Sequence, residues 1–226
     1  MTILSGILFS LLLSLISLAL AASAPVTRQI SSAQISSAAR EGRPDIHGNK
    51  VVWKRIVNGH YNIFECVLPS CSPQAVDVSA SYEYLPVTNG TQVVWHDDRN
   101  FNVNNGKSDI YVKDPGLNPY PLTGASLPGF QFYPAISGNN VVYVDSTTGR
   151  QDDPNNNIYL VDLTNQSQPV SLCTAPDGSQ CAGSQYAPRI SGNKVVWMDH
   201  RNGNWDIYEK DLPNGQEQRL TLTGDN

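Results

Sequence analysis

The chain has 226 residues, of which 40% are hydrophobic, and its formal net charge is −5. A net negative charge disfavours binding to nucleic acid or to anionic membrane surfaces, so neither is expected as a partner. Roughly 200 residues follow the N-terminal apolar segment, which is enough chain to bury one sizeable core in a single domain.

The N-terminal segment predicts a signal peptide. Residues 3–20 are apolar with Ser and Gly interspersed, and the small residues that follow suit signal peptidase. We expect cleavage after Ala21, giving a signal peptide of residues 1–21, because cleavage after Ala24 would leave Pro25 beside the cut bond. The first two residues lack the usual positive charge, so an uncleaved anchor is the alternative. No later segment has the roughly 20 apolar residues of a membrane span, and we expect the mature chain to be secreted, periplasmic or at the cell surface.

Residues 22–42 follow as a leader with one strand candidate, residues 26–30, in which Val26, Arg28 and Ile30 are the candidate assembly residues. A strand that stays free of its own domain can add to the exposed sheet edge of another molecule. Head-to-tail addition of this kind builds rings or filaments. The alternative is a flexible leader without a partner.

Four copies of one pattern fill residues 43–226. Each copy has a Pro, a Gly four residues later, Val-Val at plus seven and eight, and Trp or Tyr at plus nine. A polar loop and a second hydrophobic strand follow. The four prolines are Pro44, Pro86, Pro134 and Pro188, at spacings of 42, 48 and 54 residues. Repeats near this length, made of short strands, are typical of propeller blades.

The last copy predicts how one repeat forms one blade. Its expected strands are residues 188–191, 194–198, 205–210 and 218–222, joined by short polar turns. Pro188 suits a strand start, where its missing N–H group is not needed. We therefore predict an all-β fold, a β-propeller of four blades, each a roughly four-stranded antiparallel sheet. The expected blades are residues 43–83, 84–125, 131–174 and 185–223.

The number of outermost strands leaves one question open. The blade candidates are residues 75–78, 120–123, 169–172 and 219–221, and the leader strand is a fifth. A ring of four blades needs four outer strands. Either residues 26–30 close the ring against the last blade and displace residues 218–222, or the N-terminal strand remains free.

These residues resemble the TolB-like propeller repeat. The pattern Pro-x-Ile-Ser-Gly-Asn-x-Val-Val-Trp-x-Asp-x-Arg-x-Gly-Asn-x-Asp-Ile-Tyr is complete over residues 188–208. The first blade departs most, because Arg55 stands where the other blades have Asp. The resemblance covers residues 44–224 and implies a propeller of a kind found in exported and cell-surface proteins. It implies no particular activity, and we expect no Tol role, because the Tol protein has a further N-terminal domain and more blades.

Four cysteines fall into two close pairs, which fits an oxidising compartment. We favour the local pairings, Cys66 with Cys71 and Cys173 with Cys181, over the other two arrangements, because each pair flanks a turn. Such short loops would contribute about 2–3 kcal/mol each on a chain-entropy estimate. The alternative is a zinc site, which needs closer ligand spacings.

The polar loops supply the other candidate sites. Asn89 and Asn165 begin glycosylation triplets in predicted turns. Clustered carboxylate and amide oxygens are the ligands that calcium prefers, and the candidates are Asp97, Asp109, Asp145, Asp199 and Asp206. The alternative for these aspartates is a structural role, because Asp and Asn bond their own backbone in turns. Apart from calcium, no cofactor is expected.

No catalytic motif is present in the sequence. The four His do not converge, and neither a Gly-x-Ser-x-Gly nor a His-Glu-x-x-His pattern occurs. We therefore expect that the protein is not an enzyme. The alternative is a hydrolase whose two catalytic carboxylates meet across blades, an arrangement that a sequence pattern does not reveal.

Aromatic residues divide into two groups. Trp53, Trp95, Tyr143 and Trp197 recur inside the second strand of each blade, which indicates core packing. The candidates for contact with a partner lie in or beside loops and are Phe101, Phe130, Phe132 and Trp205. The expected function is a non-catalytic structural or protein-interaction module that self-assembles through its N-terminal strand. The alternatives are a carbohydrate-binding propeller and, less favoured, a hydrolase.

Overall fold

The computed structural model describes residues 41–101, 107–122, 129–146, 154–164, 168–173 and 181–221. Every regular element in these residues is a β-strand, and the strands form four antiparallel sheets of four strands each. The predicted all-β propeller of four blades is confirmed. None of the described residues lies in a helix long and apolar enough to cross a membrane.

Each sheet is built from consecutive strands in chain order. The first contains β1 (Glu41–His47), β2 (Lys50–Val57), β3 (His60–Val67) and β4 (Gln74–Ala75). The second contains β5 (Glu83–Thr88), β6 (Val93–Asp97), β7 (Asp109–Lys113) and β8 (Tyr120–Pro121). The third contains β9 (Phe130–Ser137), β10 (Asn140–Ser146), β11 (Asn157–Asp162) and β12 (Val170–Ser171). The fourth contains β13 (Gln185–Ser191), β14 (Lys194–Asp199), β15 (Asp206–Asp211) and β16 (Gln218–Arg219).

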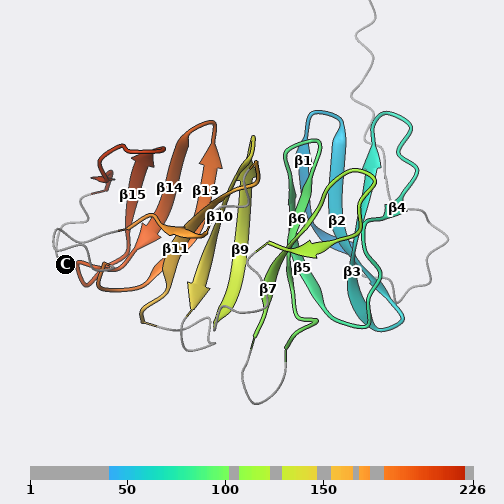
Figure 1. The fold of residues 1–226 in the computed structure, drawn as a ribbon, viewed down its shortest axis with the longest axis horizontal. Coiled ribbons are helices and arrows are strands. Elements are labelled where there is room, and N and C mark those ends of the chain that lie inside the picture. The colour runs from blue at the N-terminus through green and yellow to red at the C-terminus, as the bar shows by residue number, and fades with distance from the viewer. Residues whose placement is uncertain are drawn as a thin grey trace, which may run out of the picture.

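The sheets follow one another along the longest axis of the molecule, from the blue first sheet to the red fourth sheet (Figure 1). Each sheet packs against the next one in the chain. Within the described ranges, the fourth sheet does not pack against the first as extensively as consecutive sheets pack against each other. The four blades therefore form an arc in which the first and fourth sheets lie at opposite ends.

Apolar side chains fill the space between successive sheets. The Val-Val-aromatic strand of each sheet supplies both layers, because alternate residues of a strand point to opposite faces. Val52 and Ile63 of the first sheet, for example, pack against Trp95 and Tyr111 of the second. The four repeat aromatics are at most 4% exposed, which confirms that they belong to the core.

A β-bulge interrupts the first strand of every sheet, immediately before the repeat proline. The residue before each proline has a left-handed backbone, with φ between 50° and 53°; these residues are Arg43, Leu85, Tyr133 and Ala187. The expectation that Pro188 begins its strand is wrong, since β13 begins three residues earlier at Gln185. The bulge inserts an unpaired residue into the ladder, so the strand continues through the proline.

The outermost strands are shorter than expected, with two residues each. In the fourth sheet this place is taken by β16, so a leader strand does not displace residues 218–219. The first sheet begins at Glu41, within the predicted leader of residues 22–42. The assembly candidates Val26, Arg28 and Ile30 lie outside the described residues.

Candidate functional site

The first strands of all four sheets surround a cavity on the axis of the arc, which we call the axial cavity. It has two chambers, of about 310 and 390 Å³. The first is lined mainly by the backbone-bulge segments, including Arg43, Leu85, Tyr133 and Arg189. The second is lined by Arg43, Lys54, Tyr84, Leu85, His96, Asp98, Phe130 and Tyr133. Three of the bulge residues, Arg43, Leu85 and Tyr133, border both chambers.

A continuous series of aromatic rings runs beside the axial cavity from the first sheet to the fourth, and we call it the aromatic belt. Its members, in order, are His60, Tyr82, Tyr84, His96, Phe130, Phe132, Tyr133, Tyr186, Trp205 and His200. Neighbouring ring centroids lie 4.9–6.4 Å apart. Rings at these distances stabilise one another mostly through tilted and edge contacts. The belt therefore joins all four blades, with some of its rings buried and others partly exposed.

Positive charge collects in the second chamber. The Lys54 ammonium lies 3.8 Å from the centroid of the Tyr61 ring. Burial, and then the neighbouring Arg43 charge, lower the pKa of Lys54. The one carboxylate of this chamber belongs to Asp98, whose Oδ1 lies 3.0 Å from Nε2 of His96. An anionic group entering this chamber would meet two cations in an otherwise acidic chain.

Tyr84 lies between the cationic chamber and the aromatic belt. Burial, and then the Asp98 carboxylate, raise the pKa of Tyr84 to about 12. Its phenol therefore stays protonated at any physiological pH and can donate a hydrogen bond to an anion.

Three of the four predicted contact residues lie in the belt, but the expectation for Phe132 is wrong, because it is 0% exposed in the core. Phe130 borders the second chamber, and Trp205, 45% exposed, contacts Tyr186 and His200. Phe101 is 47% exposed and lies apart from them, in a shallow hollow next to Tyr82.

Sequence reasoning missed most of the belt, although a signal was present. Tyr84, Phe132 and Tyr186 each stand two residues before a repeat proline. An aromatic residue at one repeat position in three blades, next to a bulge, marks the axial side of the sheets.

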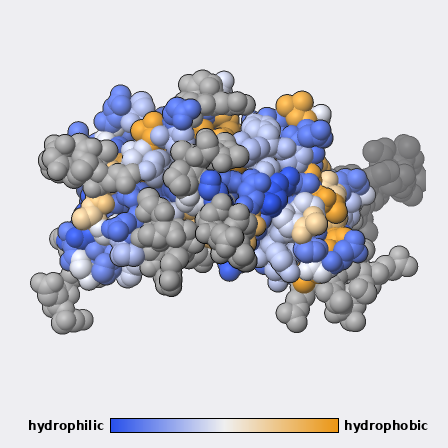
Figure 2. All heavy atoms as spheres, turned by 60° about the horizontal axis from the view of Figure 1, so that its bottom comes forward, coloured by the Kyte–Doolittle hydropathy of each residue, from blue (hydrophilic) through white to orange (hydrophobic). Residues whose placement is uncertain are grey.

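Figure 2 shows one face of the molecule, on which the coloured hydrophobic residues form separate small groups among hydrophilic ones. The exposed large hydrophobic residues are likewise spread over all four sheets. Scattered residues of this kind are normal on a soluble surface. The axial cavity differs from this face, because its lining combines positive charge with aromatic rings.

The candidate calcium ligands are not brought together, because they lie in three different sheets. Asp97 and Asp109 are a cross-strand pair in the second sheet, and Asp199 and Asp206 are the equivalent pair in the fourth. Asp145 lies in the third sheet. A single site of all five residues is therefore excluded by their positions.

Asp97 and Asp199 each hold an arginine of their own blade. Trp95 Nε1 donates to Asp97 Oδ2 at 2.9 Å, and Arg99 Nε donates to Asp97 Oδ1 at 2.9 Å. The guanidinium carbon lies 4.0 Å from the centroid of the Tyr111 ring. The fourth sheet repeats this arrangement around Asp199, with both hydrogen bonds again at 2.9 Å. These two buried carboxylates are neutralised by structural ion pairs.

Asp109 and Asp206 also have protein partners. Asn100 Nδ2 donates to Asp109 Oδ2 at 2.6 Å, and burial raises the pKa of Asp109. Asp206 Oδ2 lies 2.7 Å from Nη2 of Arg219. Four of the five aspartates thus have structural roles, and only Asp145 remains as a calcium candidate.

A buried carboxylate cluster joins the first and second sheets. It contains Asp77, Glu83 and Asp97, and the Arg99 guanidinium pairs with Asp77 and Asp97. Glu83 accepts hydrogen bonds from Ile63 N at 2.9 Å and from Ser79 Oγ at 2.8 Å. Burial, and then the neighbouring Asp77 and Asp97 charges, raise the pKa of Glu83 to about 7. Glu83 is 0% exposed, so it is out of reach of a substrate in this structure.

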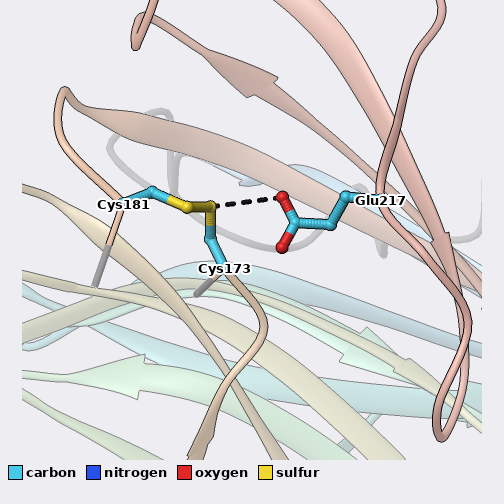
Figure 3. Close-up of side chains that lie close together, drawn as sticks. All are labelled: Cys173, Cys181 and Glu217. Atoms are coloured by element: carbon cyan, nitrogen blue, oxygen red, sulfur yellow. Dashed lines mark hydrogen bonds between the residues drawn. A yellow bond between two sulfur atoms is a disulfide. The ribbon is translucent and has the colours of Figure 1, made fainter. Parts of the chain in front are cut away.

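Both cysteine pairs form the local disulfides expected from the sequence. Figure 3 shows Cys173, Cys181 and Glu217 side by side, with a Glu217 oxygen 3.3 Å from the Cys173 sulfur. The same carboxylate lies 2.9 Å from Nη1 of Arg201. Sulfurs joined in a disulfide are not thiolate ligands, so this cluster does not provide the zinc site that was the alternative.

The Asn89 side chain is part of a turn. Its Nδ2 donates to Gly138 O at 2.7 Å, and its Oδ1 accepts from Thr91 N and Gln92 N. A glycan attached to Nδ2 would have to compete with the Gly138 bond. Asn165 lies outside the described residues.

No family model and no curated protein matches the sequence. Solved structures do match the fold. A TolB from Agrobacterium tumefaciens is 19% identical with a TM-score of 0.56, over 82% of this chain and 63% of that one. A puromycin hydrolase is 13% identical with a TM-score of 0.58, over 80% and 29% of the two chains. An oligogalacturonate lyase in complex with manganese is 14% identical with a TM-score of 0.57, over 83% and 55%.

These likenesses establish a TolB-like propeller fold. The chain spans less than two thirds of the length of each of these structures. Since the names of these proteins include a hydrolase and a lyase, the fold by itself does not select an activity.

Proposed function

We propose that this chain is a non-catalytic, exported propeller that binds a protein partner at the axial cavity and the aromatic belt. The observation that carries the proposal is the belt, a series of aromatic contacts shared by all four blades. Its partly exposed rings at the second chamber lie beside Arg43 and Lys54. Aromatic and arginine side chains dominate the energetics of protein interfaces. The cations favour a partner that presents an acidic segment.

Export is supported by the apolar N-terminal segment and by the two disulfides, which persist in oxidising compartments. The absence of catalysis is supported by the carboxylates. Asp97 and Asp199 are held by arginines, and Glu83 is buried away from the axial cavity.

A binding experiment tests the proposed site. A labelled hexaglutamate peptide is titrated against the mature chain, with hexalysine as the control peptide. We expect hexaglutamate alone to bind, and to bind more weakly as salt rises. Replacing Arg43 and Lys54 together by Gln should weaken binding about ten-fold, since two part-exposed charges contribute about that much. Lys113→Gln is the matched control, because Lys113 lines neither chamber.

A carbohydrate-binding propeller is the second candidate. Its support is the number of aromatic rings, because sugars stack on ring faces. Many belt rings already cover one another, however, with Phe130 and His96 at an interplanar angle of 80°. A selective hit on a glycan array, without binding of hexaglutamate, would favour this candidate over ours.

Self-association through residues 26–30 is the finer part of the proposal. Its support is the outer edge of the first and fourth sheets. There β4 and β16 are only two residues long, so the longer strands β3 and β15 have no full-length neighbour on their outer side. Light scattering after size-exclusion chromatography compares the chain from Ala22 with a chain from Arg40. Oligomers of the longer chain alone would support strand addition, and two monomers would contradict it.

A further inference from the structure

Asp145 is a buried carboxylate without the partner that its equivalents have. It is 9% exposed, and its Oδ1 has no hydrogen-bond partner. The equivalent Asp97 and Asp199 each bind a tryptophan Nε1 and an arginine from two residues further along the chain. A buried, unpaired carboxylate is costly, so a compensating group is expected at Asp145.

The third blade lacks both groups that compensate the other two aspartates. Tyr143 takes the place of the tryptophan, and its hydroxyl is also without a hydrogen-bond partner. Thr147 takes the place of the arginine in the sequence. The compensation at Asp145 therefore has to come from another source.

Two residues with amide side chains flank Asp145 within the third sheet. Gln131 in β9 and Asn157 in β11 are its direct cross-strand neighbours, and cross-strand neighbours project to the same face. Gly129 lies against Asp145 Oδ1 and the main-chain oxygen of Ser146, and a Cβ at Gly129 would collide with both. Its φ of +141° is likewise a conformation suited to glycine. A side chain at this position would therefore crowd both oxygens.

We propose that Asp145 is the anchoring ligand of a calcium ion, with the Ser146 carbonyl and the amide oxygens of Gln131 and Asn157 as further ligands. Carboxylate, amide and main-chain carbonyl oxygens are the set that calcium takes in proteins, with six to eight ligands in flexible geometry. Magnesium fits less well, because it demands a near-ideal octahedron and gives up its waters reluctantly. One carboxylate among neutral ligands predicts weak binding, in the millimolar range of extracellular calcium modules.

Thermal unfolding of the full mature chain tests this site. We expect about 10 mM calcium to raise the melting temperature by about 3–5 °C over the protein in chelator, for a dissociation constant of about 1 mM. Equal concentrations of magnesium should give a clearly smaller rise. Asp145→Asn, which keeps the shape and removes the charge, should abolish the calcium response. Asp162→Asn is the matched control, since Asp162 is a half-buried carboxylate of the same sheet, at the end of β11 opposite to the Asp145 pair, and accepts hydrogen bonds from Thr164.

The proposal is overturned by any of three results. These are no calcium response in the wild type, an equal response to magnesium, or a calcium response that survives Asp145→Asn. Calorimetric titration of the wild type with calcium tests the site without any variant, and it should give one calcium ion per chain. A chain that binds no calcium but becomes more stable on acidification would show that a proton, and no metal ion, neutralises Asp145.

Discussion

Replacing Glu83 by Gln should stabilise the protein at neutral and alkaline pH. Glu83 is fully buried, and its pKa is raised from 4.5 to about 7 by burial and by the nearby Asp77 and Asp97 charges. The folded protein therefore holds this proton more tightly than the unfolded chain does. The resulting stability is complete below about pH 4.5 and is lost as the pH rises through about 7.

The magnitude follows from the two pKa values. Each tenfold change in a proton-binding constant is worth about 1.4 kcal/mol, so ionised Glu83 lowers the free energy of unfolding by about 3 kcal/mol at pH 8. Gln has no charge to bury. Its carbonyl can still accept from Ile63 N, as Gln185 accepts from Ile158 N at the same position of the fourth sheet.

Urea unfolding followed by tryptophan fluorescence, from pH 4 to pH 9, measures the effect. Taking the difference in the free energy of unfolding between wild type and Glu83→Gln cancels the contributions of the other titrating groups. We expect a difference near zero at pH 4 and a gain of about 2–3 kcal/mol for the variant at pH 8. Gln185→Glu is the reciprocal control and should lose stability as the pH rises. A difference that does not change with pH, or a variant less stable at pH 8, would refute the reasoning.

Three further stability predictions concern the core, an ion pair and a disulfide. Ile110→Ala should cost about 3–4 kcal/mol in urea unfolding, because Ile110 is 0% exposed between the second and third sheets. Arg201→Gln should cost about 3–5 kcal/mol by leaving Asp199 buried and unpaired, and adding Asp199→Asn should restore part of that loss. A double variant that is no more stable than Arg201→Gln would contradict the ion-pair account. Replacing Cys66 and Cys71 together by Ser should lower the free energy of unfolding by about 2–3 kcal/mol, and an unchanged urea midpoint would contradict this.

The sequence was sufficient for the blades because their signal is local. The repeat proline, the turn glycine and the Val-Val-aromatic strand all act within one hairpin, and each blade follows the same rule. The bulge was not predictable from the rule that proline begins a strand. That rule assumes a regular ladder, whereas the left-handed residue before Pro188 lets the strand run through it.

The sites were harder to predict than the blades because they depend on which side chains fold onto one another. Asp97, Asp199 and Asp145 were all metal candidates because they begin polar loops rich in Asp and Asn, and all three occupy one repeat position. What separates them is the residue two places later, an arginine after the first two and a threonine after Asp145. This difference is present in the sequence, but its meaning depends on knowing that Arg99 and Arg201 fold back onto their own aspartates.

In the first, second and fourth sheets, a guanidinium lies over an aromatic ring at the same place. In the first sheet the positions of the positive and negative residues are exchanged. Arg55 takes the place of the aspartate, its Nε donates to Glu41 Oε1 at 2.6 Å, and its guanidinium carbon lies 4.2 Å from the centroid of the Phe64 ring. The second and fourth sheets place Arg99 and Arg201 over a tyrosine ring.

The third sheet has the carboxylate, Asp145, and a tyrosine at the ring position, Tyr159. Supplying the arginine that the other blades carry should therefore replace the proposed calcium ion. We expect Thr147→Arg to raise the melting temperature in chelator and to remove the response to calcium, whereas Thr147→Gln, of similar length without charge, should do neither. A Thr147→Arg protein that keeps the full calcium response would show that a guanidinium and calcium do not compete at Asp145.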